Sequence, residues 1–256
     1  MRFLLTNDDG IYARGLSALH EELSKDAECL IVAPDTEQSA VGHAITISRP
    51  LTVRRAKKNS AFWGYAVSGT PADCVKIGVR ELSEKPIDLV VSGINLGANV
   101  GINVIYSGTV SAATEGAILG IPSLAPSLNT FRDADFTFAA RFARKLVKFM
   151  RHDNPLKNIP LNVNIPATPE REIKGVVVVK QGRARLMETF EKRVDPRDHI
   201  YYWLAGETQL AEGEEDTDAS QLKKGFITIT PIYYDLTRHD ALEILKKGMT
   251  GFEFPA

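Results

Sequence analysis

Residues 2–34, RFLLTNDDGIYARGLSALHEELSKDAECLIVAP, decide the fold class of this chain of 256 residues. The stretch opens with an apolar, β-prone run that stops at the turn formers NDDG, residues 7–10. Leucines at helical spacing follow, and a second continuous apolar run ends at Pro34. A strand, a helix and a strand in this order predict the crossover unit of a parallel sheet that is covered on both faces.

The alternation of strands and helices continues outward from this unit. Apolar runs predict strands at residues 87–91, 121–125 and 161–165, and helical patterns predict helices at residues 70–82, 110–119 and 135–150. We also expect a long loop at residues 34–50 and a hairpin that pairs residues 51–53 with residues 65–67. The whole pattern predicts an α/β fold with an open, mostly parallel, doubly wound sheet and helices on both faces.

The pattern changes beyond about residue 175. Isolated strands are predicted at residues 176–180, 200–204 and 226–232, joined by polar loops. Such strands present apolar edges that commonly need a partner to cover them, so we expect residues 190–232 to make a subunit contact. The predicted organisation is a single domain over residues 1–256, with a core at 1–175 and an antiparallel β-hairpin extension plus a C-terminal helix at 176–256.

Composition and charge exclude several classes of protein. The 31 Lys and Arg residues nearly balance the 32 Asp and Glu residues, so no strong field would hold a nucleic-acid polymer or an anionic membrane. The sequence also lacks an apolar run of roughly 18 residues, the length of a membrane span. Cys29 and Cys74 lie inside apolar runs and predict free thiols in a reducing compartment, so we expect a cytoplasmic protein.

Polar side chains follow several of the predicted strands. Asp8 and Asp9 follow the first strand, Ser39 lies in the loop after the second, and Asn95 lies in a glycine-rich stretch after a later strand. Ligands of open α/β sheets bind beyond the carboxyl ends of the strands, and these oxygen ligands suit Mg²⁺ or Mn²⁺. The alternative is structural, because an Asp-Gly pair makes turns and an aspartate caps a following helix.

A second set of candidates could bind an anion. Ser107, Gly108 and Thr109 end the glycine-rich stretch where a helix is expected to begin, and helix N-termini with glycine nearby suit phosphate. The alternative is a loop that one of the two hydroxyls caps. His43 is a candidate for proton transfer or substrate contact. Neither a Walker A motif nor a dinucleotide fingerprint after the first strand is present.

Several long motifs resemble those of one known family, the SurE survival-protein nucleotidases. They occur in the family's order and span nearly the whole chain: LLTNDDG at residues 4–10, APDTEQSAVGHAIT at 33–46, VSGTPADCV at 67–75, SGINLGANVGINVIYSGTVSAATEGAILGIPSLA at 92–125, LNVNIP at 161–166, DPRDHIYYWLAG at 195–206 and DTDASQLKKGFITITPI at 216–232. One departure is Ala40, where the family more often has glycine after the serine, so the backbone of that loop is expected to differ slightly.

The resemblance implies a fold, an activity and an assembly. It implies a Rossmann-like domain whose C-terminal hairpin is exchanged between the subunits of a homodimer, with pairing into a homotetramer as a further expectation. The implied enzyme is a cytoplasmic, metal-dependent phosphatase of nucleoside 5'-monophosphates, with activity also on 3'-nucleotides and short polyphosphate. It also implies that one divalent cation per subunit, Mg²⁺ or Mn²⁺, is ligated by Asp8, Asp9, Ser39 and Asn95.

We therefore predict hydrolysis of a phosphomonoester by water, with Asp8 and Asp9 as the catalytic residues. The predicted phosphate and substrate contacts are Asn95, Ser107, Gly108, Thr109 and His43. One alternative is a covalent phosphatase in which an aspartate attacks phosphorus, although such enzymes typically space two aspartates by one residue. A second alternative is a nucleotide-sensing module that binds without turnover.

Overall fold

The computed structural model describes residues 1–152, 158–209 and 214–252, and its centre is a 10-stranded sheet. The order of the strands is β3-β4-β2-β1-β5-β7-β8-β12-β9, and β6 pairs with β7 off this path. The strands are β1 (Arg2–Thr6), β2 (Glu28–Pro34), β3 (Val53–Lys58), β4 (Ala61–Val67), β5 (Leu89–Ser92), β6 (Asn95–Leu96), β7 (Ser123–Asn129), β8 (Pro160–Pro166), β9 (Val176–Val178) and β12 (Ile227–Pro231). The predicted α/β class is confirmed.

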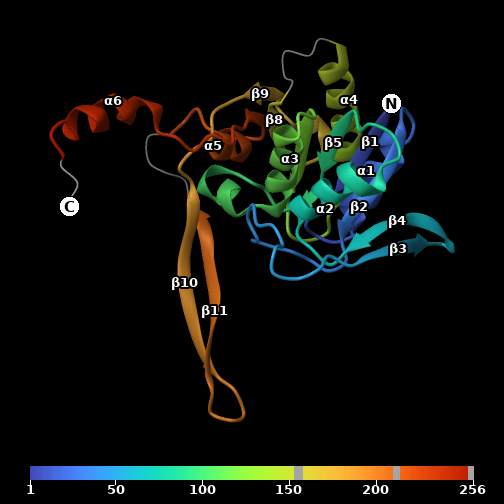
Figure 1. The fold of residues 1–256 in the computed structure, drawn as a ribbon, viewed down its shortest axis with the longest axis horizontal. Helices are drawn as coiled ribbons and strands as arrows, with labels where there is room; N and C mark the ends of the chain where they lie inside the picture. The colour runs from blue at the N-terminus through green and yellow to red at the C-terminus, as the bar shows by residue number, and fades with distance from the viewer. Residues whose placement is uncertain (153–157, 210–213, 253–256) are drawn as a thin grey trace.

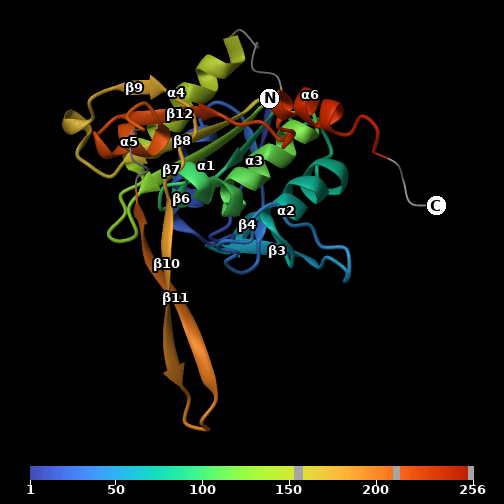
Figure 2. The same cartoon turned by 90° about the vertical axis from the view of Figure 1, so that its left-hand side faces the viewer.

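Helices and one separate hairpin complete the fold. The helices are α1 (Arg14–Leu23), α2 (Pro71–Ile77), the π-helix η1 (Gly78–Leu82), the 3-10 helix η2 (Gly101–Tyr106), α3 (Gly108–Ile118), α4 (Thr137–His152), the 3-10 helix η3 (Glu170–Glu172), α5 (Asp218–Lys223) and α6 (His239–Gly248). Strands β10 (Arg185–Val194) and β11 (Ile200–Gln209) form the antiparallel hairpin, which extends away from the sheet in Figure 1 and Figure 2.

The order of the parallel strands fixes where a ligand can bind. Strand β1 pairs in parallel with β2 on one side and with β5 on the other, so the chain changes direction across the sheet at β1. In an open α/β sheet the crevice beyond the carboxyl ends of the strands at such a switch point is the usual ligand site. Asp8 and Asp9 follow β1, and Asn95 follows β5.

The core lies on both faces of the sheet, as the continuous apolar strands predict. Phe3 and Leu5 of β1 pack in one buried cluster with residues of α1 and α4. Leu4, on the opposite face, packs in another cluster with residues of α2 and α3. Neighbouring side chains of a strand alternate between faces, so the three central residues of β1 contribute to both layers. Burial of this apolar area, at about 25 cal/mol per Å², is the main source of stability.

Most of the predicted elements occur, with shifts of a few residues at their ends. The helix expected at residues 70–82 begins with a capping box between Thr70 and Asp73, and it continues past Ile77 as a π-helix to Leu82. The predicted hairpin pairs Val53 with Val67, and residues 35–52 contain no helix or strand. Cys74 is buried, whereas Cys29 is only partly buried, and both are free thiols.

One expectation about the C-terminal part is wrong. The apolar segment at residues 226–232 does not form an exposed edge, because β12 pairs antiparallel with β8 and parallel with β9 inside the main sheet. Ile227 and Thr228 are almost completely buried there. The alternation of FITITPI resembles an exposed antiparallel strand, but here both faces are covered by the rest of the domain. The strands of this region with exposed side chains are the edge strand β9 and the hairpin strands β10 and β11.

Candidate active site

Three loops meet at the carboxyl ends of β1, β2 and β5. The loop after β1 turns at Gly10, whose φ of 97° favours glycine, and the Asn7 side chain donates to the Gly10 carbonyl at 3.0 Å. The Gln38 backbone N–H donates to the Asp8 carbonyl at 2.8 Å, which joins the loop after β2 to it. The Leu96 backbone N–H bonds the Asp9 carboxylate, which joins the strand after β5 to the same place.

Asp8 is held in position by the start of α3. The Thr109 backbone N–H donates to Asp8 Oδ2 at 3.1 Å, and the Thr109 hydroxyl donates to Asp8 Oδ1. Burial raises the pKa of the Asp8 carboxyl above its ordinary value, against the hydrogen bonds from Thr109, which lower it. Both oxygens of this carboxylate are thus oriented by one residue that lies far away in the sequence.

Asp9 is less buried than Asp8 and lacks a hydrogen bond to Thr109. Burial, followed by the negative charge of Asp8, raises the pKa of Asp9 to about 7. Glu37 adds a further negative charge that acts on both aspartates. Adjacent carboxylates in this environment repel each other, and a divalent cation between them would relieve that repulsion.

The loop after β2 brings Ser39 and Glu37 to this edge. The Ser39 hydroxyl donates to Glu37 Oε1 at 2.5 Å. The next residue, Ala40, has a φ of 55°, a left-handed conformation that glycine adopts without steric cost. The sequence departure at this position therefore costs about 1 kcal/mol in backbone strain while the left-handed conformation is kept. Sequence reasoning missed Glu37, although its position two residues before Ser39 was a usable signal.

Asn95 begins the short strand β6, which pairs with β7. Its Nδ2 donates to the Gly97 carbonyl at 2.8 Å, so the carbonyl oxygen Oδ1 is the atom left to act as a ligand. The oxygen donors of Asp8, Asp9, Ser39 and Asn95 fit Mg²⁺ or Mn²⁺. Within the described ranges, no group of three or more His, Cys, Asp or Glu side chains could hold a metal, so a cation here would also need these hydroxyl and amide oxygens.

The residues predicted to bind phosphate have several structural contacts. Ser107 is the N-cap of α3, because its hydroxyl accepts from the Val110 backbone N–H at 3.1 Å. Thr109 bonds Asp8, as described above. The backbone N–H of Gly108 lies in the first turn of α3. Within the described part of the chain it donates no hydrogen bond to a protein acceptor, so a phosphate oxygen could accept from it.

His43 lies against α3. Its Nε2 is 2.9 Å from Glu115 Oε2, and Lys76 Nζ donates to Glu115 Oε1 at 2.6 Å. Burial opposes ionisation of Glu115, but the bonds from His43 and Lys76 outweigh it and lower the Glu115 pKa. This cluster, which sequence spacing did not reveal, fixes the loop at residues 39–47 against α2 and α3.

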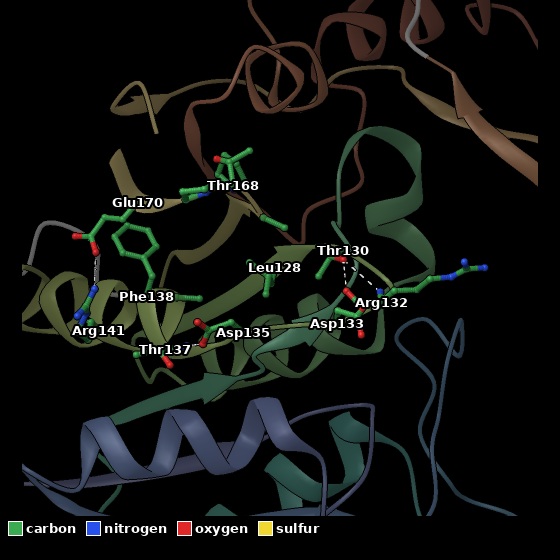
Figure 3. Close-up of a pocket in the computed structure, with 14 residues that line it drawn as sticks. Leu128, Thr130, Arg132, Asp133, Asp135, Thr137, Phe138, Arg141, Thr168 and Glu170 are labelled. Carbon is green, nitrogen blue, oxygen red and sulfur yellow. Dashed lines mark hydrogen bonds and ion pairs between the residues drawn. The ribbon is translucent and has the colours of Figure 1, made fainter. Parts of the chain in front are cut away.

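Two cavities lie beyond this edge of the sheet. The smaller, which we call the Asp9 cavity, has a volume of about 220 Å³ and is lined by Asp9, residues 13–15, Leu96, residues 131–134 and Phe136. The larger, of about 450 Å³, lies between the loop before α4 and residues 166–170, and Figure 3 shows Asp135, Arg141 and Glu170 around it. None of the predicted site residues lines the larger cavity.

The raised pKa of Asp9 predicts a pH-dependent stability of the metal-free protein. An aspartate with a pKa of 3.8 when unfolded and about 7 when folded binds more protons in the folded state between those values. The free energy of unfolding should therefore fall as the pH rises from about 4 to about 7. In chelator at pH 8, Asp9→Asn should raise stability by about 1–3 kcal/mol, which is several degrees in Tm.

The measurement is a thermal melt of both proteins in chelator across this pH range. At pH 4 the two melting temperatures should nearly agree, because Asp9 is then protonated in the folded state and only about half ionised in the unfolded state. Equal melting temperatures at pH 8 would show that the Asp9 carboxylate is not destabilised by its surroundings.

Comparisons with known proteins identify the family of this chain. The family model described as "Survival protein SurE" matches residues 3–188. The 5'-nucleotidase SurE of Syntrophus aciditrophicus is 70% identical over 96% of this chain and 93% of that protein. The 5'-nucleotidase SurE of Syntrophobacter fumaroxidans is 48% identical over 96% of this chain and 99% of that protein.

A solved structure extends the agreement to the fold. The crystal structure of the SurE protein from Aquifex aeolicus is 40% identical, covers 96% of this chain and 99% of its own, and superposes with a TM-score of 0.82. Separately, no helix within residues 1–152, 158–209 and 214–252 has both the length and the apolar character needed to cross a bilayer. Sequence, fold and family model agree, and the chain belongs to the SurE family.

Proposed function

We propose that this protein is a metal-dependent 5'-nucleotidase that hydrolyses nucleoside 5'-monophosphates to nucleoside and phosphate. The observation that carries the proposal is the pair Asp8 and Asp9, two neighbouring carboxylates with raised pKa values at the switch point of the sheet, beside the N-terminus of α3. The names of the relatives, 5'-nucleotidase SurE, support the substrate class. Activity on 3'-nucleotides and short polyphosphate is part of the same proposal.

Each part of the site has a task in this reaction. Asp8, Asp9, Ser39 and Asn95 would hold one Mg²⁺ or Mn²⁺, which neutralises charge on the phosphate and activates water. Thr109 keeps Asp8 in one orientation. The Gly108 N–H and the positive end of the α3 dipole favour the phosphate oxygens, and this positioning supplies much of the catalysis of phosphoryl transfer.

Direct attack by water is favoured over an aspartyl-phosphate intermediate. Both carboxylate oxygens of Asp8 accept hydrogen bonds from Thr109, so neither is poised to attack phosphorus. Asp9 would have to act alone, without the second aspartate two residues away that such enzymes typically carry. A phosphorylated protein in the intact mass after acid quench would favour the covalent alternative.

The test is phosphate release from a panel of nucleoside monophosphates, first in chelator and then with Mg²⁺ or Mn²⁺ restored. We expect release only with the metal, and faster release from 5'-monophosphates than from a phosphomonoester without a base. Tight nucleotide binding with no phosphate release under any condition would instead identify a sensing module.

We further propose that the hairpin makes a homodimer, which can pair into a homotetramer. Phe190, Val194, Ile200, Tyr202 and Leu204 share one face of the β10–β11 hairpin, and each is more than half exposed. A two-stranded hairpin is only marginally stable by itself, so an apolar face of this kind needs a cover. A second copy of the chain is the cover that closed symmetry favours.

Replacing Phe190 with Lys and Leu204 with Glu should convert the assembly to a monomer, as measured by light scattering. The two positions face each other, so an opposite-charge pair keeps the hairpin formed while it removes the apolar face. Phe149→Glu, at an exposed position on α4, is the matched control and should keep the native mass. A monomeric native protein at micromolar concentration would refute the dimer.

The proposal also includes a cytoplasmic location and a small-molecule substrate. Both cysteines are free thiols, which suits a reducing compartment. The net charge of -1 gives no general attraction for a nucleic-acid polymer.

A further inference from the structure

The Asp9 cavity combines exposed apolar side chains with a carboxylate. Phe131 is 77% exposed and Leu96 is 37% exposed, and both line this cavity beside the Asp9 carboxylate. A pocket with apolar walls and a few polar groups is the usual form of a small-molecule site. The volume of about 220 Å³ is below the roughly 300–1,000 Å³ of drug-sized sites.

The ring of Phe131 is placed by a glycine of the metal-site loop. A Cβ atom at Gly97 would lie 2.5 Å from Cε1 and 2.8 Å from Cζ of Phe131, so only glycine lets the ring lie this close to the backbone. Gly97 also accepts the hydrogen bond from Asn95. One residue therefore positions both a predicted metal ligand and an aromatic wall.

Two arginines complete the cavity. Arg14 donates to the Ala134 carbonyl at 3.2 Å, which ties α1 to the loop that carries Phe131. Arg132 also lines the cavity, and no ion pair of its guanidinium is found in the described part of the chain. Figure 3 shows the Arg132 side chain extending away from Asp135, Phe138 and Arg141. Its donors are thus available for the carbonyl and ring-nitrogen acceptors of a base or for ribose hydroxyls.

We propose that the Asp9 cavity binds the nucleoside part of the substrate, with the base stacked on Phe131 and Arg132 donating to the base or ribose. The inference rests on the proposed nucleotidase function, since it requires the phosphate to lie at Asp8 and Asp9. Arg132 borders both cavities, but the larger cavity is a poorer candidate, because neither aspartate of the candidate metal site lines it and its Arg141 and Glu170 already pair at 2.5 Å. The size of the Asp9 cavity favours a single nucleoside over a dinucleotide.

The first test compares two substrates in the full-length enzyme with Mg²⁺ or Mn²⁺. Stacking of a base on an aromatic ring is worth about 1–3 kcal/mol, so Phe131→Ala should lower kcat/KM for adenosine 5'-monophosphate, relative to glycerol phosphate, by roughly 5- to 150-fold. Phe131→Tyr should restore the ratio. Phe149→Ala removes an aromatic ring of similar exposure on α4 and should leave the ratio unchanged.

The second test measures binding of the nucleoside alone by calorimetry. Adenosine should bind the native protein and lose most of its affinity in Phe131→Ala, with a smaller loss in Arg132→Ala. Equal loss of activity on both esters, or a native protein that hydrolyses nucleotides but binds no nucleoside, would overturn the cavity assignment. If no phosphomonoester is hydrolysed, the proposed function fails, while nucleoside binding still decides whether the cavity is a nucleoside site.

Discussion

Asp8→Asn should lower kcat/KM for a nucleoside 5'-monophosphate by about a thousandfold while the protein stays folded. An asparagine is nearly the same size, but it has no charge and presents one acceptor oxygen in place of two. The variant therefore weakens binding of a divalent cation, and its Nδ2 cannot accept either of the two hydrogen bonds that Thr109 donates. Asp9→Asn should cause a loss of similar size through the metal, although it leaves Thr109 untouched. The measurements are steady-state kinetics and a metal titration by calorimetry.

A suitable control lies at the other end of the same parallel strands. Asp88 precedes β5 and accepts from the Arg2 backbone N–H at 2.7 Å, away from the carboxyl ends where the site lies. Asp88→Asn should keep native kinetics and metal affinity. Native activity in Asp8→Asn or Asp9→Asn would show that the aspartate only forms the turn, as the Asp-Gly sequence also permits.

The fold was predictable where the apolar pattern of a segment alone indicates how it is buried. The strands at residues 2–6 and 28–34 are continuous apolar runs, and in a sheet covered on both faces such runs are buried on both sides, as Phe3 and Leu4 are. The strand at 227–231 was misplaced because its alternating pattern is the same for an exposed strand and for one packed between β8 and β9. Only the tertiary contacts distinguish the two cases.

The candidate site likewise has residues that the sequence predicts and contacts that it does not. Asp8, Asp9 and Asn95 are foreseeable because parallel strands bring their carboxyl ends to one edge. The bond from Thr109 to Asp8 joins residues 101 positions apart, and the contact of Phe131 with Gly97 likewise joins separate loops. Glu115 lies in the helix expected at residues 110–119, and its contacts with His43 and Lys76 come from loops and helices distant in the sequence. Pairings of this kind depend on how helices and loops pack, which local sequence does not encode.

Gly108→Val is expected to reduce kcat/KM by about a hundredfold or more. A Cβ atom at this position would lie 2.9 Å from Asp8 Cβ, 3.0 Å from Asp8 Oδ2 and 3.1 Å from Pro71 Cγ, so any side chain must displace the Asp8 carboxylate or α2. A shift of about 1 Å in a catalytic group can cost about a hundredfold in rate. Valine also covers the Gly108 N–H. Overpacking should cost about 1–3 kcal/mol of stability, which a thermal melt would detect without loss of the fold.

Two further variants separate this steric effect from general damage to α3. Ser107→Ala removes the N-cap hydrogen bond to Val110 but leaves Asp8 undisturbed, so it should cost about 1 kcal/mol of stability and only a few-fold in rate. Gly248→Ala places a methyl group where no atom lies within 4 Å, and it should leave activity unchanged. If Gly108→Val retained native kinetics and metal affinity, neither the Asp8 carboxylate nor the N-terminus of α3 could be in contact with the reacting phosphate. If Asp8, Gly108 and the phosphate are in close contact, Gly108→Val should lower kcat/KM far more than Ser107→Ala does.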